Sequence, residues 1–217
     1  AGPLQTGGGS ADADGSTIAV SATGAASAEA DLAVVHLSVD VTAESANDAR
    51  ERAASGVNAV RSALADAGVP DANVTTTAFG ISPVYDYVDG ERELDGYRAV
   101  HSLAVETAPA NAGSVVDTAV GAGATTVGGV RFTLSDERRA DLRETAITRA
   151  MANARADADG IAAAADLSVT GVRHASTGAS FEPLPVARFE DAAGAETSFQ
   201  PAPVTVTATV DVTYRAA

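Results

Sequence analysis

Residues 69–106 read VPDANVTTTAFGISPVYDYVDGERELDGYRAVHSLAVE, and this stretch decides the fold class. Gly68 and Pro70 end a helix just before it, because glycine adopts the left-handed backbone at a helix C-terminus and proline cannot continue the helix. Two predicted strands follow at 72–84 and 94–107, and a tyrosine-bearing loop at 83–93 joins them. This order predicts a sheet of neighbouring strands with a helix packed on it.

The same kinds of pattern continue outward from this stretch. Residues 32–42 (LAVVHLSVDVT) alternate between apolar and polar, which predicts a half-buried strand. Ser45 begins a helix as its N-cap residue, and small apolar residues recur at three- and four-residue spacing up to Leu64. Ser135 precedes the longest predicted helix, whose apolar stripe is mostly alanine. The other predicted elements are that helix at 136–165, strands at 17–23, 126–134, 167–176 and 204–214, and a short helix at 109–120.

A β-α-β-β order therefore occurs twice, at 32–107 and 126–214. Sequence identity between the two units is weak, so the prediction concerns topology alone. We predict an α+β fold at 17–217, in which antiparallel or mixed sheets pack against one long and one medium helix, with a leading strand and a short helix. A flexible tether precedes it at 1–16, because this tract of Gly, Ala and Asp has too little apolar surface to fold.

The charge composition is strongly acidic. Acidic residues number 29 against 14 basic residues, all of them arginine, for a net charge of −15. A GC-rich genome explains the absence of lysine but not the acidic excess. We interpret the charge as a surface adapted to high salt, typical of halophilic archaea, where self-repulsion is screened. The same charge argues against nucleic acid and anionic lipid as partners, because both need clustered cations.

Several features favour export to the cell surface or beyond. The chain begins at Ala1, which is typical of a mature terminus left after a signal is removed, and a trimmed expression fragment is the alternative. The triplet from Asn73 to Thr75 is a candidate glycosylation sequon. No apolar run approaches the roughly 20 residues that span a bilayer, so no membrane span is predicted.

No residue pattern indicates catalysis, a cofactor or a metal. The histidines are His36, His101 and His174, and each lies in a predicted strand, where a lone histidine is usually a satisfied polar residue. The glycines at 121–123 follow a helix, which is the reverse of the order that cradles phosphate. No Gly-x-Ser-x-Gly motif supports a hydrolase. We therefore predict a protein without enzymatic activity, and a metal site that uses one of the histidines remains an alternative.

The aromatic residues gather in two predicted loops, at 83–93 and 178–203, or beside them. Exposed apolar side chains usually mark contact surfaces, and tyrosine is enriched there. We predict that these residues form an interface, and the alternative is that the loops cover the domain's own core. The candidate interface residues are Phe79, Tyr85, Tyr87, Tyr97, Phe181, Phe189 and Phe199.

The order and spacing of these segments resemble the SIMPL-domain family. The segments include the helix end at 64–69, Gly96-Tyr97-Arg98-Ala99, the strand exit at 129–136 and the helix segment at 150–156. Bacterial members of that family include a periplasmic immunogenic outer-membrane antigen. The resemblance implies an exported or envelope-associated protein that assembles into a ring-like homo-oligomer, with a link to stress defence and no established catalytic residues. Pro201-Ala202-Pro203 departs from the Pro-Gly turn that often precedes the family's last strand.

Two hypotheses follow for the function. The first is a secreted or cell-surface protein without enzymatic activity that assembles with itself into a ring or a filament. The second is a monomeric or dimeric envelope module that binds a small ligand, a metal or a partner protein in stress protection.

Overall fold

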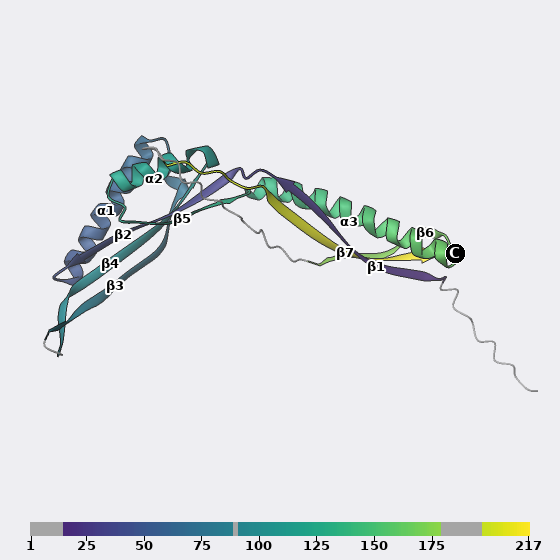
Figure 1. The fold of residues 1–217 in the computed structure, drawn as a ribbon, viewed down its shortest axis with the longest axis horizontal. Helices are drawn as coiled ribbons and strands as arrows, with labels where there is room; N and C mark the ends of the chain where they lie inside the picture. Colours follow the sequence, from purple (N-terminus) through teal and green to yellow (C-terminus); the bar gives the residue numbers. More distant parts are fainter. Residues whose placement is uncertain (1–14, 89–90, 179–196) are drawn as a thin grey trace, which may run out of the picture. The chain divides into compact units, whose positions relative to one another are not determined.

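The computed structural model describes residues 15–88, 91–178 and 197–217. It has two compact units (Figure 1). The first, called here the three-stranded unit, comprises the described residues of 15–26, 141–178 and 206–217. The second, called the four-stranded unit, comprises those of 27–140 and 197–205. Strands and helices are both abundant, so the prediction of an α+β fold is confirmed.

The three-stranded unit packs one helix on one sheet. Its strands follow the order β1 (Thr17–Ala28), β7 (Val204–Ala216) and β6 (Val169–Gly178). The helix is α3 (Asp136–Ala164), and its alanine stripe packs on Val210, Val212 and Tyr214 of β7. Alanine contributes less transfer free energy than leucine, but it lets the helix approach the sheet closely.

That close approach depends on a glycine in β1. A Cβ atom at Gly24 would lie 2.2 Å from the Ala146 carbonyl oxygen and 2.3 Å from the Ala150 nitrogen, so the backbone of α3 rests directly on this residue. No side chain fits between the two backbones. Gly24 therefore sets the distance between β1 and α3.

The four-stranded unit has the strand order β3 (Val74–Val88), β4 (Glu91–Thr107), β2 (Leu32–Ala43) and β5 (Thr126–Thr133). Two helices, α1 (Ala46–Asp66) and α2 (Ala112–Gly121), pack against it, and short 3-10 turns η1 (Asp71–Asn73) and η2 (Pro109–Asn111) lie before β3 and α2. The strand β5 pairs with β2 rather than with β6 and β7, which follow it in the chain.

Helix α1 forms as its sequence predicts. The Ser45 side chain accepts a hydrogen bond from the Asp48 backbone N–H at 3.1 Å, which satisfies a donor that the first turn leaves unpaired. The chain leaves the helix through Gly68 at φ +89°. The predicted N-cap, apolar stripe and terminating glycine are all confirmed. The stripe that is buried against the sheet consists of Ala49, Ala53, Val57, Val60 and Leu64.

The predicted tyrosine-bearing loop is wrong in extent. Strand β3 continues to Val88 and β4 starts at Glu91, so Tyr85 and Tyr87 lie on a paired strand (Figure 1). The reason is the alternation of Phe79, Ile81, Tyr85 and Tyr87, since aromatic and β-branched residues fit a pleated surface.

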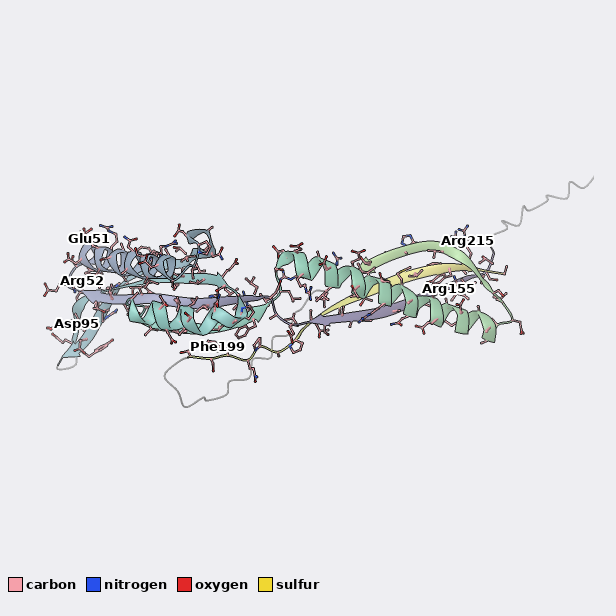
Figure 2. The ribbon with its side chains drawn as sticks, turned by 90° about the horizontal axis from the view of Figure 1, so that it is seen from above. Glu51, Arg52, Asp95, Arg155, Phe199 and Arg215 are labelled. Carbon is pink, nitrogen blue, oxygen red and sulfur yellow. The ribbon has the colours of Figure 1, made fainter. Side chains whose placement is uncertain are left out.

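The segment 197–199 is held against α2 in the four-stranded unit. The Thr197 hydroxyl donates to the Asp117 carboxylate at 2.7 Å, and the Phe199 ring lies 6.0 Å from the Phe132 ring. Phe199 is labelled in Figure 2, next to α2. A Cβ atom at Gly113 would lie 1.7 Å from the Thr197 carbonyl oxygen. The Thr197 carbonyl therefore packs directly on the backbone of Gly113, where no side chain would fit.

Replacing Gly24 by alanine should destabilise the protein by about 1–3 kcal/mol, because the added methyl group forces α3 away from β1. Gly160→Ala is the matched control, since a Cβ atom at this site in α3 meets open space. It should instead stabilise the protein by roughly 0.5–1 kcal/mol. Urea unfolding measures both, and equal midpoints for the two variants would contradict the close contact.

Gly113→Ala should displace Thr197 from α2 and loosen Phe199, because the new methyl group occupies the place of the Thr197 carbonyl oxygen. NMR should then show altered ring signals of Phe132 and faster hydrogen exchange at the Thr197 amide. The control is Gly121→Ala at the end of the same helix, where a Cβ atom meets open space. Unchanged Phe132 signals in Gly113→Ala would show that the segment is not seated on this glycine.

Candidate interaction surface

The paired ends of β3 and β4 form what we call the arm, residues 78–88 and 91–102. Two irregularities in the pairing decide which side chains share a face. In the first, Thr76 pairs with Leu103 and Ala78 with Ser102, so Thr77 is an extra residue in β3. This bulge inverts the alternation along β3, because side chains follow a period of two. Phe79 consequently lies opposite His101, on the face of the sheet that carries the helices.

The second irregularity lies in β4. Val84 pairs with Gly96 and Tyr85 with Leu94, so Asp95 is the extra residue, next to Gly96 at φ +145°. Because the insertion is in β4, the alternation along β3 continues unchanged. Tyr85 and Tyr87 therefore share the face of Phe79, and they face Leu94 and Arg92 across the strands.

The result is a row of large apolar side chains on one face, which we call the aromatic strip. Of the nine large apolar side chains exposed in the described residues, five belong to this row. A contiguous exposed apolar patch usually marks a surface that binds another molecule. The strip consists of Phe79, Ile81, Tyr85, Tyr87 and Leu94, with exposed fractions of 51, 37, 41, 71 and 52%.

The strip is uncovered because α1 packs farther inward on the same face. Ala49 and Ala53 of α1 contact Ala43 of β2 and Ala99 of β4, and Tyr97 packs half-buried beside them. This contact buries the apolar side chains of β2 and β4 under α1. It leaves Phe79 and Ile81 of the outer strand β3 without a helix above them. The sheet is thus wider than its helical cover.

Two contacts fix side chains on the strip. The Arg92 guanidinium lies 3.7 Å above the Tyr85 ring centre, a cation–π contact. The Phe79 ring meets His101 edge-on at 5.4 Å, and His101 Nε2 lies 3.0 Å from the Thr76 hydroxyl. Partial burial, with a smaller contribution from the Arg61 charge, lowers the pKa of His101 below its ordinary value. The histidine therefore stays neutral at pH 7.

The opposite side of the arm, which we call the reverse face, has a different chemistry. Near the tip it carries carboxylates: Asp86 pairs with Glu93 directly across the strands, and Glu91 pairs with Val88. The same two strands thus present large apolar side chains on one face and, apart from Arg98 and Val100 of β4, small or acidic ones on the other. The remaining β3 residues of the reverse face are small or short, namely Ala78, Gly80, Ser82 and Val84.

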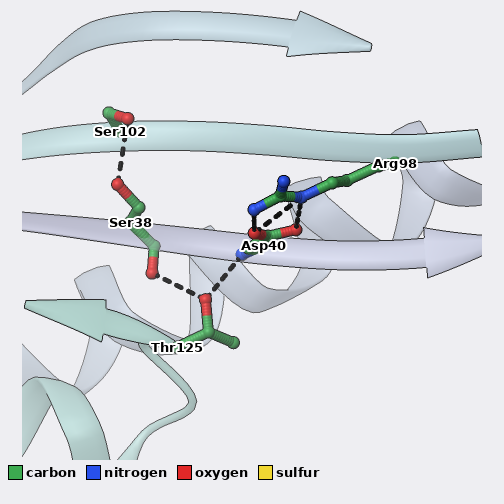
Figure 3. A network of polar contacts seen from close by, with 5 residues as sticks. All are labelled: Ser38, Asp40, Arg98, Ser102 and Thr125. Carbon is green, nitrogen blue, oxygen red and sulfur yellow. Dashed lines mark hydrogen bonds and ion pairs between the residues drawn. The ribbon is translucent and has the colours of Figure 1, made fainter. Parts of the chain in front are cut away.

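A polar network continues the reverse face inward onto β2 (Figure 3). Arg98 Nε donates to both carboxylate oxygens of Asp40 at 2.8 Å, and the Ser38 and Ser102 hydroxyls lie 3.0 Å apart. Thr125 accepts from the Asp40 backbone N–H at 2.8 Å and donates to the Ser38 carbonyl at 3.1 Å. Hydrogen bonds from Arg98 hold the pKa of Asp40 below its ordinary value. This network fastens β4 and the segment before β5 to β2.

The histidines do not gather into a site. His36 and His101 lie on opposite faces of the four-stranded sheet, and His174 lies on β6 of the other sheet. Among the residues that the structure describes, no three His, Asp or Glu side chains converge in a way that could hold a metal ion. Within those same residues, no helix is long and apolar enough to cross a membrane.

The candidate interface residues predicted from sequence fall into three groups. The strip brings together Phe79, Tyr85 and Tyr87, whereas Tyr97 packs beside α1 and Phe199 packs against Phe132. Phe181 and Phe189 lie outside the described residues. The aliphatic members Ile81 and Leu94 are not among the interface residues predicted from sequence. For Ile81, the signal that could have identified it is its period-two spacing with Phe79 and Tyr85.

The candidate glycosylation residue Asn73 lies in the turn η1 before β3. It is half-buried, and its side-chain nitrogen donates to the Glu106 carbonyl at 3.2 Å. Attachment of a glycan replaces one of the two hydrogens on this nitrogen and leaves the other as a donor.

Replacing Asp40 by asparagine tests the network on the reverse face. Because the folded-state pKa of Asp40 lies below 3.8, its contribution to stability is fully present above that pH and is lost as the pH falls through the folded value. Asp40→Asn should therefore be less stable than the unmodified protein at pH 7, and the difference should shrink below about pH 4. Urea unfolding across this range measures it. Asp157→Asn, at an exposed position of α3, is the control, and a difference independent of pH would contradict the role of the ion pair.

The chain matches a known protein family over nearly the whole of the described fold. The model of the SIMPL family, described as "Protein of unknown function (DUF541)", matches residues 18–214. The chain is similar to the 26 kDa periplasmic immunogenic proteins of Brucella melitensis biotype 1 and Brucella abortus strain S19. Each is 32% identical over 178 residues, which cover 79% of this chain and 70% of the relative. The family match extends from β1 into β7, and the chain belongs to the SIMPL family.

Proposed function

We propose that this chain is an exported envelope protein without enzymatic activity that assembles with itself into a ring or a filament. The observation that carries the proposal is the aromatic strip on the arm. Exposing five large apolar side chains in one row costs solubility unless another surface covers them. The strip is confined to one face and fixed by strand register, as a specific contact surface requires.

The family supports the envelope part of the proposal. The Brucella relatives are periplasmic proteins by name, and the family model has no assigned activity. The acidic composition favours a salty environment, since the self-repulsion of a chain with a net charge of −15 is weakest where salt screens it. We propose that the assembly lies at the cell surface or outside the cell of a salt-adapted organism.

A second candidate is a monomeric or dimeric envelope module that binds a small ligand, a metal or a partner protein. It is favoured by a pocket in the four-stranded unit lined by Asn73, Glu106, Asn111 and Ser114. These groups offer hydrogen-bond donors and acceptors but no cluster of cations. A protein that stays monomeric would direct attention to this pocket.

Light scattering coupled to size exclusion, with negative-stain images of the same peak, tests self-assembly. We expect particles much larger than the 21.5 kDa chain. The double variant Phe79→Ser with Tyr87→Ser should shift the mass toward the monomer, because it removes two strongly exposed rings of the strip.

The matched control is Ile161→Ser. Ile161 is 49% exposed on α3, so the variant removes a similar exposed apolar side chain outside the strip. It should leave the particle mass unchanged. A monomeric parent protein, or an assembly that survives the double variant, would overturn the proposed role of the strip.

A further inference from the structure

We infer that the aromatic strip of one copy docks on the reverse face of the arm of a second copy. This inference rests on the proposed self-assembly and names the surface that receives the strip. Two independent kinds of complementarity support it, one of size and one of charge.

The two faces of the arm are complementary in size. Sheets that pack face to face lie about 10 Å apart and fill the gap with interdigitated side chains. Large residues against large residues overfill such a gap, and small against small leave it empty. A large face against a small face fills it. Along β3 the strip projects Phe79, Ile81, Tyr85 and Tyr87, whereas the reverse face carries Ala78, Gly80, Ser82 and Val84.

The two faces are also complementary in charge. The cation of the strip is Arg92, and no carboxylate pairs with it within the described residues. On the reverse face Asp86 and Glu93 lie directly opposite each other, with Glu91 closer to the tip. Like charges in such a cross-strand position are destabilising. A cation supplied by another molecule would relieve this repulsion, and Arg92 of a second copy is such a cation.

A strip-on-strip contact is less favourable for the same reasons. It would bring two sets of large side chains together and leave Asp86 and Glu93 without a cation. Docking of the strip on the reverse face uses a different surface on each partner, so every copy can receive one neighbour and contact another. Contacts of this head-to-tail kind close into a ring where the rotation permits and otherwise extend into a filament.

Charge reversal in separate copies tests the inference. Arg92→Glu and Glu93→Arg should each weaken assembly roughly tenfold or more, because each places like charges across the contact. An equimolar mixture of the two variants should assemble again. In the mixture, the new carboxylate at position 92 of one variant would meet the new guanidinium at position 93 of the other, and the next contact along the assembly would keep the original charges. The measurement is particle mass at the lowest salt at which the parent protein remains folded.

Two further variants separate assembly from folding. Glu93→Gln removes the repulsion with Asp86, so it should raise the monomer's unfolding midpoint in urea while it lowers the association constant. Glu144→Arg, at an exposed position of α3, makes the same charge change as Glu93→Arg outside the arm and should not alter assembly. Circular dichroism confirms that each variant is folded.

The outcomes distinguish the inference from the proposed function. If the parent protein assembles but Glu93→Arg assembles equally well, or if the mixture fails to recover, the strip docks elsewhere and the inference is wrong while self-assembly stands. If the parent protein is monomeric under all salt conditions, both are wrong. Recovery that occurs only in the mixture supports contact between the two different faces.

Discussion

Two inserted residues determine which side chains of the arm share a face, because strand side chains alternate strictly between the two faces of a sheet. Thr77 in β3 and Asp95 in β4 each add one residue to a paired strand. The asymmetry of the arm follows from the alternation of large and small residues along β3, and the two bulges determine which face the large residues take and which β4 side chains lie beside them. If Thr77 were paired with Ser102 in a regular ladder, Phe79, Ile81, Tyr85 and Tyr87 would point to the side where Ala78, Gly80, Ser82 and Val84 now lie.

The helices that pack on the sheet explain why apolar side chains on the face of the aromatic strip are exposed along the arm. Helix α1 covers the inner strands with alanine, valine and leucine, and its contact with β2 and β4 is close. Beyond it the same face continues across the part of β3 that belongs to the arm, where no helix of the described residues covers Phe79 and Ile81. The three-stranded unit uses a different solution, in which an alanine stripe and Gly24 bring the helix backbone against the strand. Small residues thus allow a close approach of helix and sheet in both units.

Much of the fold could be predicted from the sequence. The cap at Ser45, the glycine at 68 and the alternation in β2 and β7 predicted the right elements, because each has a local physical cause. The arm could not be predicted in the same way. A bulge has no reliable signature in residue type, so the faces of Phe79 and Tyr87 were not visible before the pairing was known. Treating all aromatic residues as one group also placed Tyr97 and Phe199 beside them, although the structure packs both against apolar neighbours of their own unit.

In the proposed arm-to-arm contact, salt would act in opposite directions on the charged and the apolar component. Screening weakens the attraction between Arg92 and the carboxylates, since the Debye length is only about 3 Å at 1 M. The same screening removes the general repulsion between copies that each carry a charge of −15, and excluded salts strengthen apolar burial. Because the overall repulsion involves many charges and the specific attraction few, added salt favours association until screening is complete. Above that point the aromatic strip would supply the affinity of the proposed contact, and the charges on the arm would determine mainly which face the strip meets.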